Sequence, residues 1–345
     1  MAEFFLGANS GKGFYSLYED FCTDKGDYLH LIKGGPGCGK SNFMRRIGEK
    51  AEELGYEVEY ILCSGDPDSL DGIYIAELKV GYADATAPHV LEPRHFGADS
   101  DYVNLGQFCS LPPRNEVEGC TEKYKSYYKR AYSLLRAAAE IRLADFPNLT
   151  ENSELSYINR RARSAVSRIV GKPCGDAVIR RRFIHCISCR GELTLSDTIN
   201  TLCKQICVLD NRLGLANHYL QSVIEAAKTR RDDIIVCPSP LLPDVPEAVI
   251  FPHQRVGFIA SDVYSADKPY RHVRLDAIIP ADRVRAHKSE MKKSEKIYGN
   301  IMELACLNLA EAKRLHDELE SIYKPYMDFS ALDKFTEQEI KKLFA

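Results

Sequence analysis

Residues 34 to 41 read Gly34-Gly35-Pro36-Gly37-Cys38-Gly39-Lys40-Ser41 and fit the pattern G-x-x-x-x-G-K-[ST] of a phosphate-binding loop, the P-loop. The apolar run Tyr28-Leu29-His30-Leu31-Ile32 precedes it and predicts a short buried strand. After the loop, apolar residues at helical spacing predict a helix that Gly55 ends; they are Met44, Ile47, Ala51 and Leu54. Strand, loop and helix in this order are the context that the motif requires.

The residue types of the loop suit a polyphosphate. Glycines let consecutive backbone N–H groups curl around an anion at φ values that a side chain would resist. The helix that begins near Gly39 points its positive end at the same anion. We expect Lys40 to reach the β and γ oxygens and the Ser41 hydroxyl to coordinate Mg²⁺. The sequence therefore predicts a nucleoside triphosphate site at the loop and Asn42, with ATP and Mg²⁺ as cofactors.

Further catalytic groups are expected where predicted strands end. Residues 57–62 and 79–83 predict a second and a third strand, which with the first make a parallel α/β unit. Asp84 follows the third strand and is the candidate for a second Mg²⁺ ligand, with a turn-capping aspartate as the alternative. Asp66 follows the second strand, where it could orient a water molecule or a substrate.

Four nearby residues have a structural interpretation beside a chemical one. Asp68 and Asp71 are predicted to make turns rather than to position water. His89 is a candidate base, with a structural histidine as the favoured alternative. Cys38 lies where a helix N-terminus could lower the pKa of its thiol, but a small residue that the loop tolerates is the better hypothesis.

Weak internal similarity indicates a duplication. At an offset of 178 residues, the stretch 5–13 lies over 183–191 with Phe, Ser and the last Gly identical. At an offset of 176, Lys79-Val80-Gly81-Tyr82 lies over Arg255-Val256-Gly257-Phe258. A small drift of this kind is what short loop deletions produce. We therefore predict two homologous halves, joined near the Gly- and Pro-containing stretch 171–175.

The length of 345 residues also corresponds to about two domains. The predicted fold class is α/β, with two tandem P-loop-type parallel-sheet domains, of which the second is degenerate. We expect the first domain to span residues 1–172 and to include a helical segment at 115–170. The second is expected to span 173–345, with C-terminal helices at 286–325.

The second half carries an altered loop. At an offset of 177 the loop positions read Asn211-Arg212-Leu213-Gly214-Leu215-Ala216-Asn217-His218. Asn217 stands at the lysine position and cannot supply a positive charge, and His218 stands at the position of the Mg²⁺ hydroxyl. Ala216 replaces a glycine and resists its backbone geometry. We predict that this half does not bind a triphosphate in the usual way and has a structural or regulatory role.

Composition excludes several classes of protein. Hydrophobic residues make up 45% and charged residues 28% of the chain, which excludes collagen-like, disordered and low-complexity proteins. A net charge of −3 does not favour nucleic acid or an anionic membrane as partner. The first residues lack the features of a signal peptide, and no window approaches the roughly 18 apolar residues of a membrane helix. Together with the 12 cysteines, this favours a cytoplasmic protein with reduced thiols.

Two clusters give weaker signals. Five cysteines lie between residues 174 and 207 and include a C-x-x-C, but buried thiols are favoured over a zinc site. Arginines cluster at residues 160–168 and 180–182. A solvated helix face is the favoured interpretation of these arginines, followed by a contact with nucleotide or with an acidic partner.

Several strings beside the loop resemble one family. They are residues 4–14, the stretch Cys63 to Gly72, Thr86-Ala87-Pro88-His89 and Val103-Asn104-Leu105-Gly106. The chain resembles, over nearly its whole length, a family of uncharacterised bacterial tandem P-loop proteins described as ATPases or ATP-binding proteins. The resemblance implies ATP binding but no substrate. Both halves can carry a P-loop in that family, so the altered second loop departs from it and puts any mechanism with two nucleotides in doubt.

The sequence thus predicts a P-loop NTPase that binds ATP·Mg²⁺ and hydrolyses it. Lys40 would stabilise the transferring charge, Ser41 and Asp84 would hold Mg²⁺, and Asp66 would orient water. One alternative is a small-molecule kinase in which the segment 115–170 is a lid whose arginines clamp phosphates. The other is a nucleotide-gated switch with negligible turnover that binds a protein partner.

Overall fold

The computed structural model describes residues 2–144, 149–265 and 268–345. The first half folds around a six-stranded sheet with the order β1-β5-β6-β7-β4-β8. The bounds of these strands are β1 Ala2–Phe5, β4 Tyr28–Lys33, β5 Val58–Leu62, β6 Leu70–Ile75, β7 Val80–Asp84 and β8 Ser100–Asn104.

The expectation of a parallel sheet is wrong in one respect, because the sheet is mixed. Strands β4, β7 and β8 are parallel, as are β1 and β5, but β6 runs antiparallel to both of its neighbours. This strand contains Asp71, which therefore lies in a strand and not in a turn. A β-carbon on Gly72 would lie 3.0 Å from the Tyr82 carbonyl oxygen, so β6 and β7 approach closely there.

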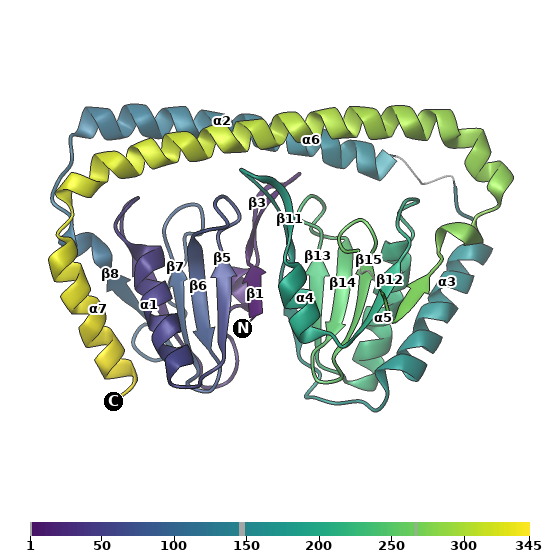
Figure 1. The fold of residues 1–345 in the computed structure, drawn as a ribbon, viewed down its shortest axis with the longest axis horizontal. Coiled ribbons are helices and arrows are strands. Elements are labelled where there is room, and N and C mark those ends of the chain that lie inside the picture. Colours follow the sequence, from purple (N-terminus) through teal and green to yellow (C-terminus); the bar gives the residue numbers. More distant parts are fainter. Residues whose placement is uncertain (1, 145–148, 266–267) are drawn as a thin grey trace.

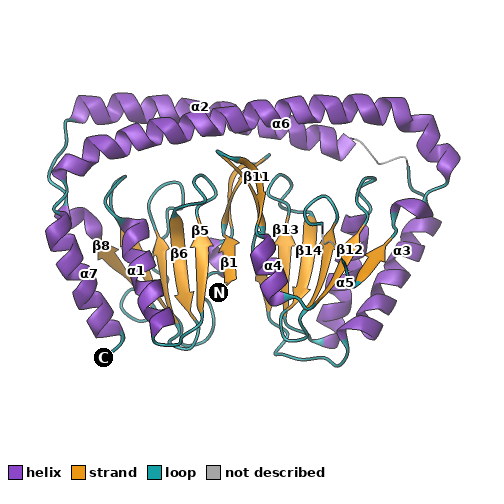
Figure 2. Ribbon diagram, viewed as in Figure 1, coloured by secondary structure: helices purple, strands orange, loops and turns teal. Residues whose placement is uncertain are grey.

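The second half repeats this strand order as β9-β13-β14-β15-β12-β16, again with one strand, β14, antiparallel to both neighbours. Two six-stranded mixed sheets thus lie side by side (Figure 2). The bounds of these strands are β9 Ile179–Arg181, β12 Gln205–Leu209, β13 Ile234–Pro238, β14 Pro246–Phe251, β15 Val256–Ala260 and β16 Arg271–Val273.

Two hairpins and a backbone bridge join the sheets at the centre. The hairpins are β2–β3 (Gly7–Ser10 and Gly13–Ser16) and β10–β11 (His185–Ser188 and Gly191–Thr194). Phe5 and Phe183 exchange both backbone hydrogen bonds, each of 2.9 Å. The arginines at 180–182 do not form a solvated face here, because they pair with carboxylates of the first half, namely Asp24, Asp20 and Glu59.

Long helices cross between the halves (Figure 1). Helix α2 (Arg114–Ala144) leaves the first half and α6 (Ala281–Tyr323) leaves the second, and the two pack side by side in opposite directions. Beyond them, α3 (Asn152–Ala165) packs on the second half and α7 (Phe329–Leu343) on the first. Each half therefore receives its outer helix from the other.

Shorter elements complete the fold. Helix α1 (Lys40–Glu53) buries Phe43 against its own sheet and stacks it on Phe335 of α7, with ring centroids 6.1 Å apart. Helix α5 (Ala216–Arg230) has the equivalent place in the second half and packs against α3. The remaining helical elements are α4 Ser196–Leu202, the π-helical turn Val166–Val170, and 3-10 turns at Tyr18–Asp20, Leu105–Phe108, Asp276–Ile278 and Lys324–Tyr326. No helix among the described residues combines the length and apolarity needed to cross a membrane.

Candidate functional site

The glycine-rich loop connects β4 to α1 at the carboxyl end of the first sheet. Gly37 and Gly39 have φ angles of 68° and 83°, values that suit glycine because other residues meet a steric penalty there. Within the described part of the chain, the backbone N–H groups of Gly35, Gly37 and Gly39 donate no hydrogen bond. The loop therefore presents unused donors next to a helix N-terminus, a combination that suits an anion.

Lys40, the first residue of α1, folds back over the loop. Its Nζ donates to the carbonyl oxygens of Gly34 and Gly35, each at 3.0 Å, and lies 3.6 Å from Asp84 Oδ2. The Lys40 and Asp84 side chains are each 13% exposed. The structure thus brings the predicted site residues Lys40 and Asp84 together at the loop. A polyphosphate could replace the carbonyl oxygens and the carboxylate as partners of the Lys40 ammonium group.

The carboxylate of Asp84 has two kinds of neighbour. Oδ1 accepts hydrogen bonds from the backbone N–H and the hydroxyl of Thr86, at 2.8 and 2.5 Å, as a turn-capping aspartate does. Oδ2 faces Lys40. The capping interpretation and the ligand interpretation are therefore compatible, because each uses a different oxygen.

Ser41 and the other loop residues have separate environments. Ser41 Oγ accepts a hydrogen bond of 2.9 Å from the Leu70 backbone N–H, which leaves a lone pair for a further partner. Asn42 is exposed on α1. Cys38 is buried, and burial raises the pKa of its thiol despite the nearby Lys40. A side chain at position 34 would overlap the Cys38 sulfur, so this cysteine packs under the loop.

Asp66 lies against α6. Its Oδ2 accepts from the Ser69 hydroxyl at 2.9 Å and lies 3.3 Å from Lys313 Nζ. Among the described residues, no hydrogen bond or ion pair joins Asp66 to Lys40 or Asp84. The structure therefore connects this carboxylate to the crossing helix rather than to the lysine.

A buried histidine–carboxylate pair was missed in the sequence. His89 Nε2 lies 3.2 Å from Asp71 Oδ2, and the two side chains are 6% and 7% exposed. The His89 ring also packs against Phe14 and Tyr18. Burial lowers the pKa of His89, but Asp71 outweighs this effect and leaves the pKa above its usual value. The β-branched and aromatic run Ile73-Tyr74-Ile75 is the signal that could have placed a strand here, although Asp71 and Gly72 interrupt its apolar character.

The crossing helices reach the loop from the second half. A β-carbon on Gly35 would lie 3.1 Å from the Tyr323 ring, and one on Gly37 would lie 3.1 Å from the Glu320 carbonyl oxygen. A β-carbon on Gly39 would lie 2.9 Å from Leu332 of α7. The end of α6 and the start of α7 therefore pack directly on the loop.

Four arginines of the segment 115–170 lie on the second half. Arg160, Arg161, Arg163 and Arg168 belong to α3 and the turn after it, which pack against α5 of the second half. These four arginines therefore lie on the second half rather than at the loop of the first, and the kinase alternative stays a prediction. The sequence pattern identified the helices but not the sheet on which each one packs.

The second loop has a similar course with different contacts. Gly214 has a φ of 70°, close to that of Gly37. However, the Ala216 N–H donates to Asn211 Oδ1 at 3.0 Å, and the Leu213 N–H donates to Asp276 Oδ1 at 3.2 Å. Asn211 thus occupies the Ala216 donor, whose counterpart in the first loop is the open N–H of Gly39, and Asp276 occupies a further donor at Leu213.

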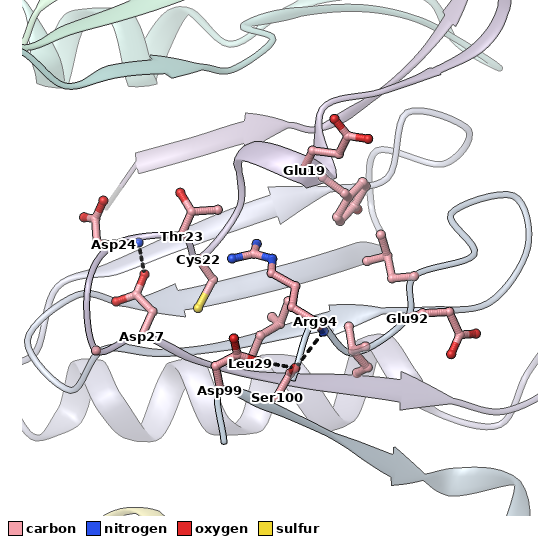
Figure 3. Close-up of a pocket in the computed structure, with 14 residues that line it drawn as sticks. Glu19, Cys22, Thr23, Asp24, Asp27, Leu29, Glu92, Arg94, Asp99 and Ser100 are labelled. Atoms are coloured by element: carbon pink, nitrogen blue, oxygen red, sulfur yellow. Dashed lines mark hydrogen bonds between the residues drawn. The ribbon is translucent and has the colours of Figure 1, made fainter. Parts of the chain in front are cut away.

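A small cavity of about 350 Å³ lies near the amino-terminal end of β4 (Figure 3). Arg94 extends into it and donates to the Phe21 carbonyl oxygen at 3.2 Å. Asp27 accepts from the Asp24 backbone N–H at 2.8 Å. None of the predicted site residues lines this cavity, which lies at the other end of β4 from the loop.

The cysteines are free thiols in the structure. In the region 174–207, Cys186, Cys203 and Cys207 are buried and Cys174 is exposed. Among the described residues, no group of His, Cys, Asp or Glu side chains is arranged to hold a metal ion by itself. Mg²⁺ sites of the phosphate-bound kind need only one or two protein ligands, so this finding does not bear on Ser41 and Asp84.

Comparisons of the chain with protein-family models, with curated proteins and with solved structures give no match.

Proposed function

We propose that the chain binds ATP·Mg²⁺ at Gly34–Ser41 and hydrolyses it. The observation that carries this proposal is the contact between Lys40 and Asp84 beside backbone donors that the protein itself leaves unused. A lysine held only by carbonyl oxygens and one carboxylate can turn to a polyphosphate, and Mg²⁺ would then pair with the carboxylate that it leaves. The α1 N-terminus adds its partial positive charge at the same place.

The residues present fit the roles that this chemistry requires. Ser41 Oγ keeps a lone pair, and Asp84 Oδ2 would be released when Lys40 turns away, so both oxygens could hold Mg²⁺. Bound Mg²⁺ would neutralise charge on the phosphates. Lys40 would stabilise the charge that develops on the transferred group. The contacts of Asp66 with Lys313 favour a positioning role at the α6 interface over direct activation of water.

A nucleotide-gated switch is the second candidate, and one observation favours it. Tyr323, Glu320 and Leu332 pack against the loop glycines, although they belong to helices that continue from the second half. Binding at the loop and the position of α6 are therefore linked, because a ligand that shifts the loop must also shift its packing partners. In this function the helices, rather than the released phosphate, would carry the output.

Phosphate release from ATP·Mg²⁺ by the purified chain, without added acceptor, tests the proposal. We expect release that falls at least about tenfold in Asp84→Asn, because one ligand of the metal is weakened. Asp262→Asn, a carboxylate beside the second loop, is the matched control and should leave release unchanged.

Release that is insensitive to Asp84→Asn would refute hydrolysis at this site. A different pattern would favour the nucleotide-gated switch. In that case ATP·Mg²⁺ would raise the melting temperature of the wild type but not of Lys40→Ala, and no phosphate would be released. Release that requires an added metabolite would select the kinase alternative.

A further inference from the structure

A cavity lies in the second half of the molecule. Its volume is about 1160 Å³, and it lies between the carboxyl edge of the second sheet and the first turns of α6. The end of α2 closes one side, where Arg142 pairs with Glu295 at 2.8 Å. Ligand sites in proteins commonly have volumes of about 300–1000 Å³, so this space can hold a metabolite.

The wall formed by α6 carries positive charge. Arg285, Lys288 and Lys292 line the cavity at positions that share one face of the helix. Among the described residues, no carboxylate lies within ion-pair distance of these three side chains. Three uncompensated cations at one end of a cavity favour an anion, and phosphate is the group that such side chains bind most readily.

The opposite wall, at the sheet edge, offers acceptors. Glu247 Oε2 lies 3.1 Å from His185 Nδ1, and these side chains are 14% and 11% exposed. Asp262 accepts two hydrogen bonds from the Asn211 side-chain amide, at 3.0 and 2.9 Å. Asn217 Oδ1 is buried without a hydrogen-bond partner in the described part of the chain. Acceptors in this arrangement suit the hydroxyl groups of a ligand. A buried acceptor normally receives a hydrogen bond, so a ligand hydroxyl group could supply the donor that Asn217 Oδ1 lacks.

Apolar side chains form part of the remaining surface, among them Leu213, Leu215 and Met291. An apolar surface of this kind suits the face of a ring. A ligand with a phosphate, hydroxyl groups and a planar ring would match all three surfaces.

We propose that this cavity binds a phosphomonoester with a hydroxylated, ring-bearing body, of the class and size of a nucleoside monophosphate. Its phosphate would lie against Arg285, Lys288 and Lys292, and its hydroxyl groups against Glu247 and Asp262. The site does not use the second loop as a phosphate cradle, because Asn211 and Asp276 occupy that loop's donors. The proposal is independent of nucleotide binding at Gly34–Ser41.

Titration calorimetry of the full chain with AMP tests the proposal, with adenosine as the probe that lacks phosphate. We expect AMP to bind and Lys288→Glu to weaken it at least about tenfold, since a charge-assisted contact becomes a repulsion. Lys293→Glu makes the same change on an exposed part of α6 outside the cavity and should leave the affinity within about twofold. Adenosine should bind at least about tenfold more weakly than AMP.

Lys40→Ala separates this site from the first loop. Binding of AMP that persists in Lys40→Ala and falls in Lys288→Glu supports the proposal. Binding that is lost in Lys40→Ala but kept in Lys288→Glu would place AMP at the P-loop and overturn it. Failure of the wild-type chain to bind AMP at millimolar concentration, or equal binding of adenosine and AMP, would also overturn it.

Discussion

The two loops at the carboxyl ends of β4 and β12 have a similar backbone course but different hydrogen-bond partners. Both follow a buried strand, both contain a glycine with φ near 70°, and both lead into a helix. They differ in what their backbone N–H groups contact. In the first loop the N–H groups of Gly35, Gly37 and Gly39 donate to nothing within the described residues, whereas in the second the N–H groups of Leu213 and Ala216 donate to Asp276 and Asn211.

The loops differ in local charge as well. Lys40 supplies a cation at the first loop, and Asn217 at the same position supplies none. Asp276, which contacts the second loop, adds a carboxylate that repels an anion, although burial raises its pKa. We therefore expect unsatisfied donors and net positive charge, more than the backbone course, to decide which loop binds a phosphate.

The largest expected effect concerns the two residues at the lysine position. Lys40→Ala should weaken ATP·Mg²⁺ binding about tenfold or more, because a charge-assisted contact contributes about 1.5–3 kcal/mol. Asn217→Ala should change it by less than about twofold. Titration calorimetry on the intact chain measures both, with one nucleotide expected per polypeptide. A fitted value near two, with one event that survives both Lys40→Ala and Lys288→Glu, would show that the second loop still binds nucleotide.

A smaller effect concerns a feature that the halves share. His89–Asp71 and His185–Glu247 are buried pairs at the same edge of each sheet, and in both the carboxylate outweighs burial and raises the histidine pKa. The stability gained from protonating each histidine is present below its unfolded pKa of about 6.5 and is lost as the pH rises through the raised folded pKa.

Asp71→Asn and Glu247→Gln should therefore both destabilise the protein more at pH 5.5 than at pH 8.5. We expect the melting temperature of each variant to fall below that of the wild type by a few degrees more at pH 5.5 than at pH 8.5. Thermal unfolding of each variant beside the wild type at the two pH values measures it. A destabilisation that grows towards pH 8.5 in either variant would contradict the assigned sign for that pair.

The smallest expected effect comes from placing a lysine in the second loop, which we do not expect to create a nucleotide site. Asn217→Lys restores the motif's cation, but Asn211 and Asp276 still occupy the loop donors, so we expect no second nucleotide to bind. Calorimetry in the Lys40→Ala background gives the cleanest readout, because the first loop is then weakened. A strong ATP·Mg²⁺ event in that double variant would mean that charge alone distinguishes the loops.

Local patterns predicted the elements of the fold better than their arrangement. The apolar run before the loop and the helical spacing after it correspond to β4 and α1 within a residue or two. Strand β6 was missed because Asp71 and Gly72 break its apolar character, and the sheet was consequently expected to be parallel. The exchange of α3 and α7 between the halves leaves no trace in periodicity, since an amphipathic helix shows which face is buried but not against what.

The same holds for the candidate site. Lys40 and Asp84 could be paired from sequence because the strands before them were expected to be parallel neighbours, and carboxyl ends of parallel strands share one edge. The Asp66–Lys313 contact could not be predicted, because 247 residues of chain separate the partners and no local rule relates them. Contacts between halves depend on packing, which a single sequence does not display.

Helix α6 has a mechanical consequence. It is one continuous helix of 43 residues, so it acts as a stiff rod about 65 Å long. Its first turns face the cavity of the second half, and its last turns press on Gly35 and Gly37. A rod that pivots near its middle on α2 moves its two ends in opposite directions, and a tilt of about 5° displaces each end by about 3 Å. A pivot of this kind would convert a small displacement at one end of α6 into an equal and opposite one at the other, as the beam of a balance does.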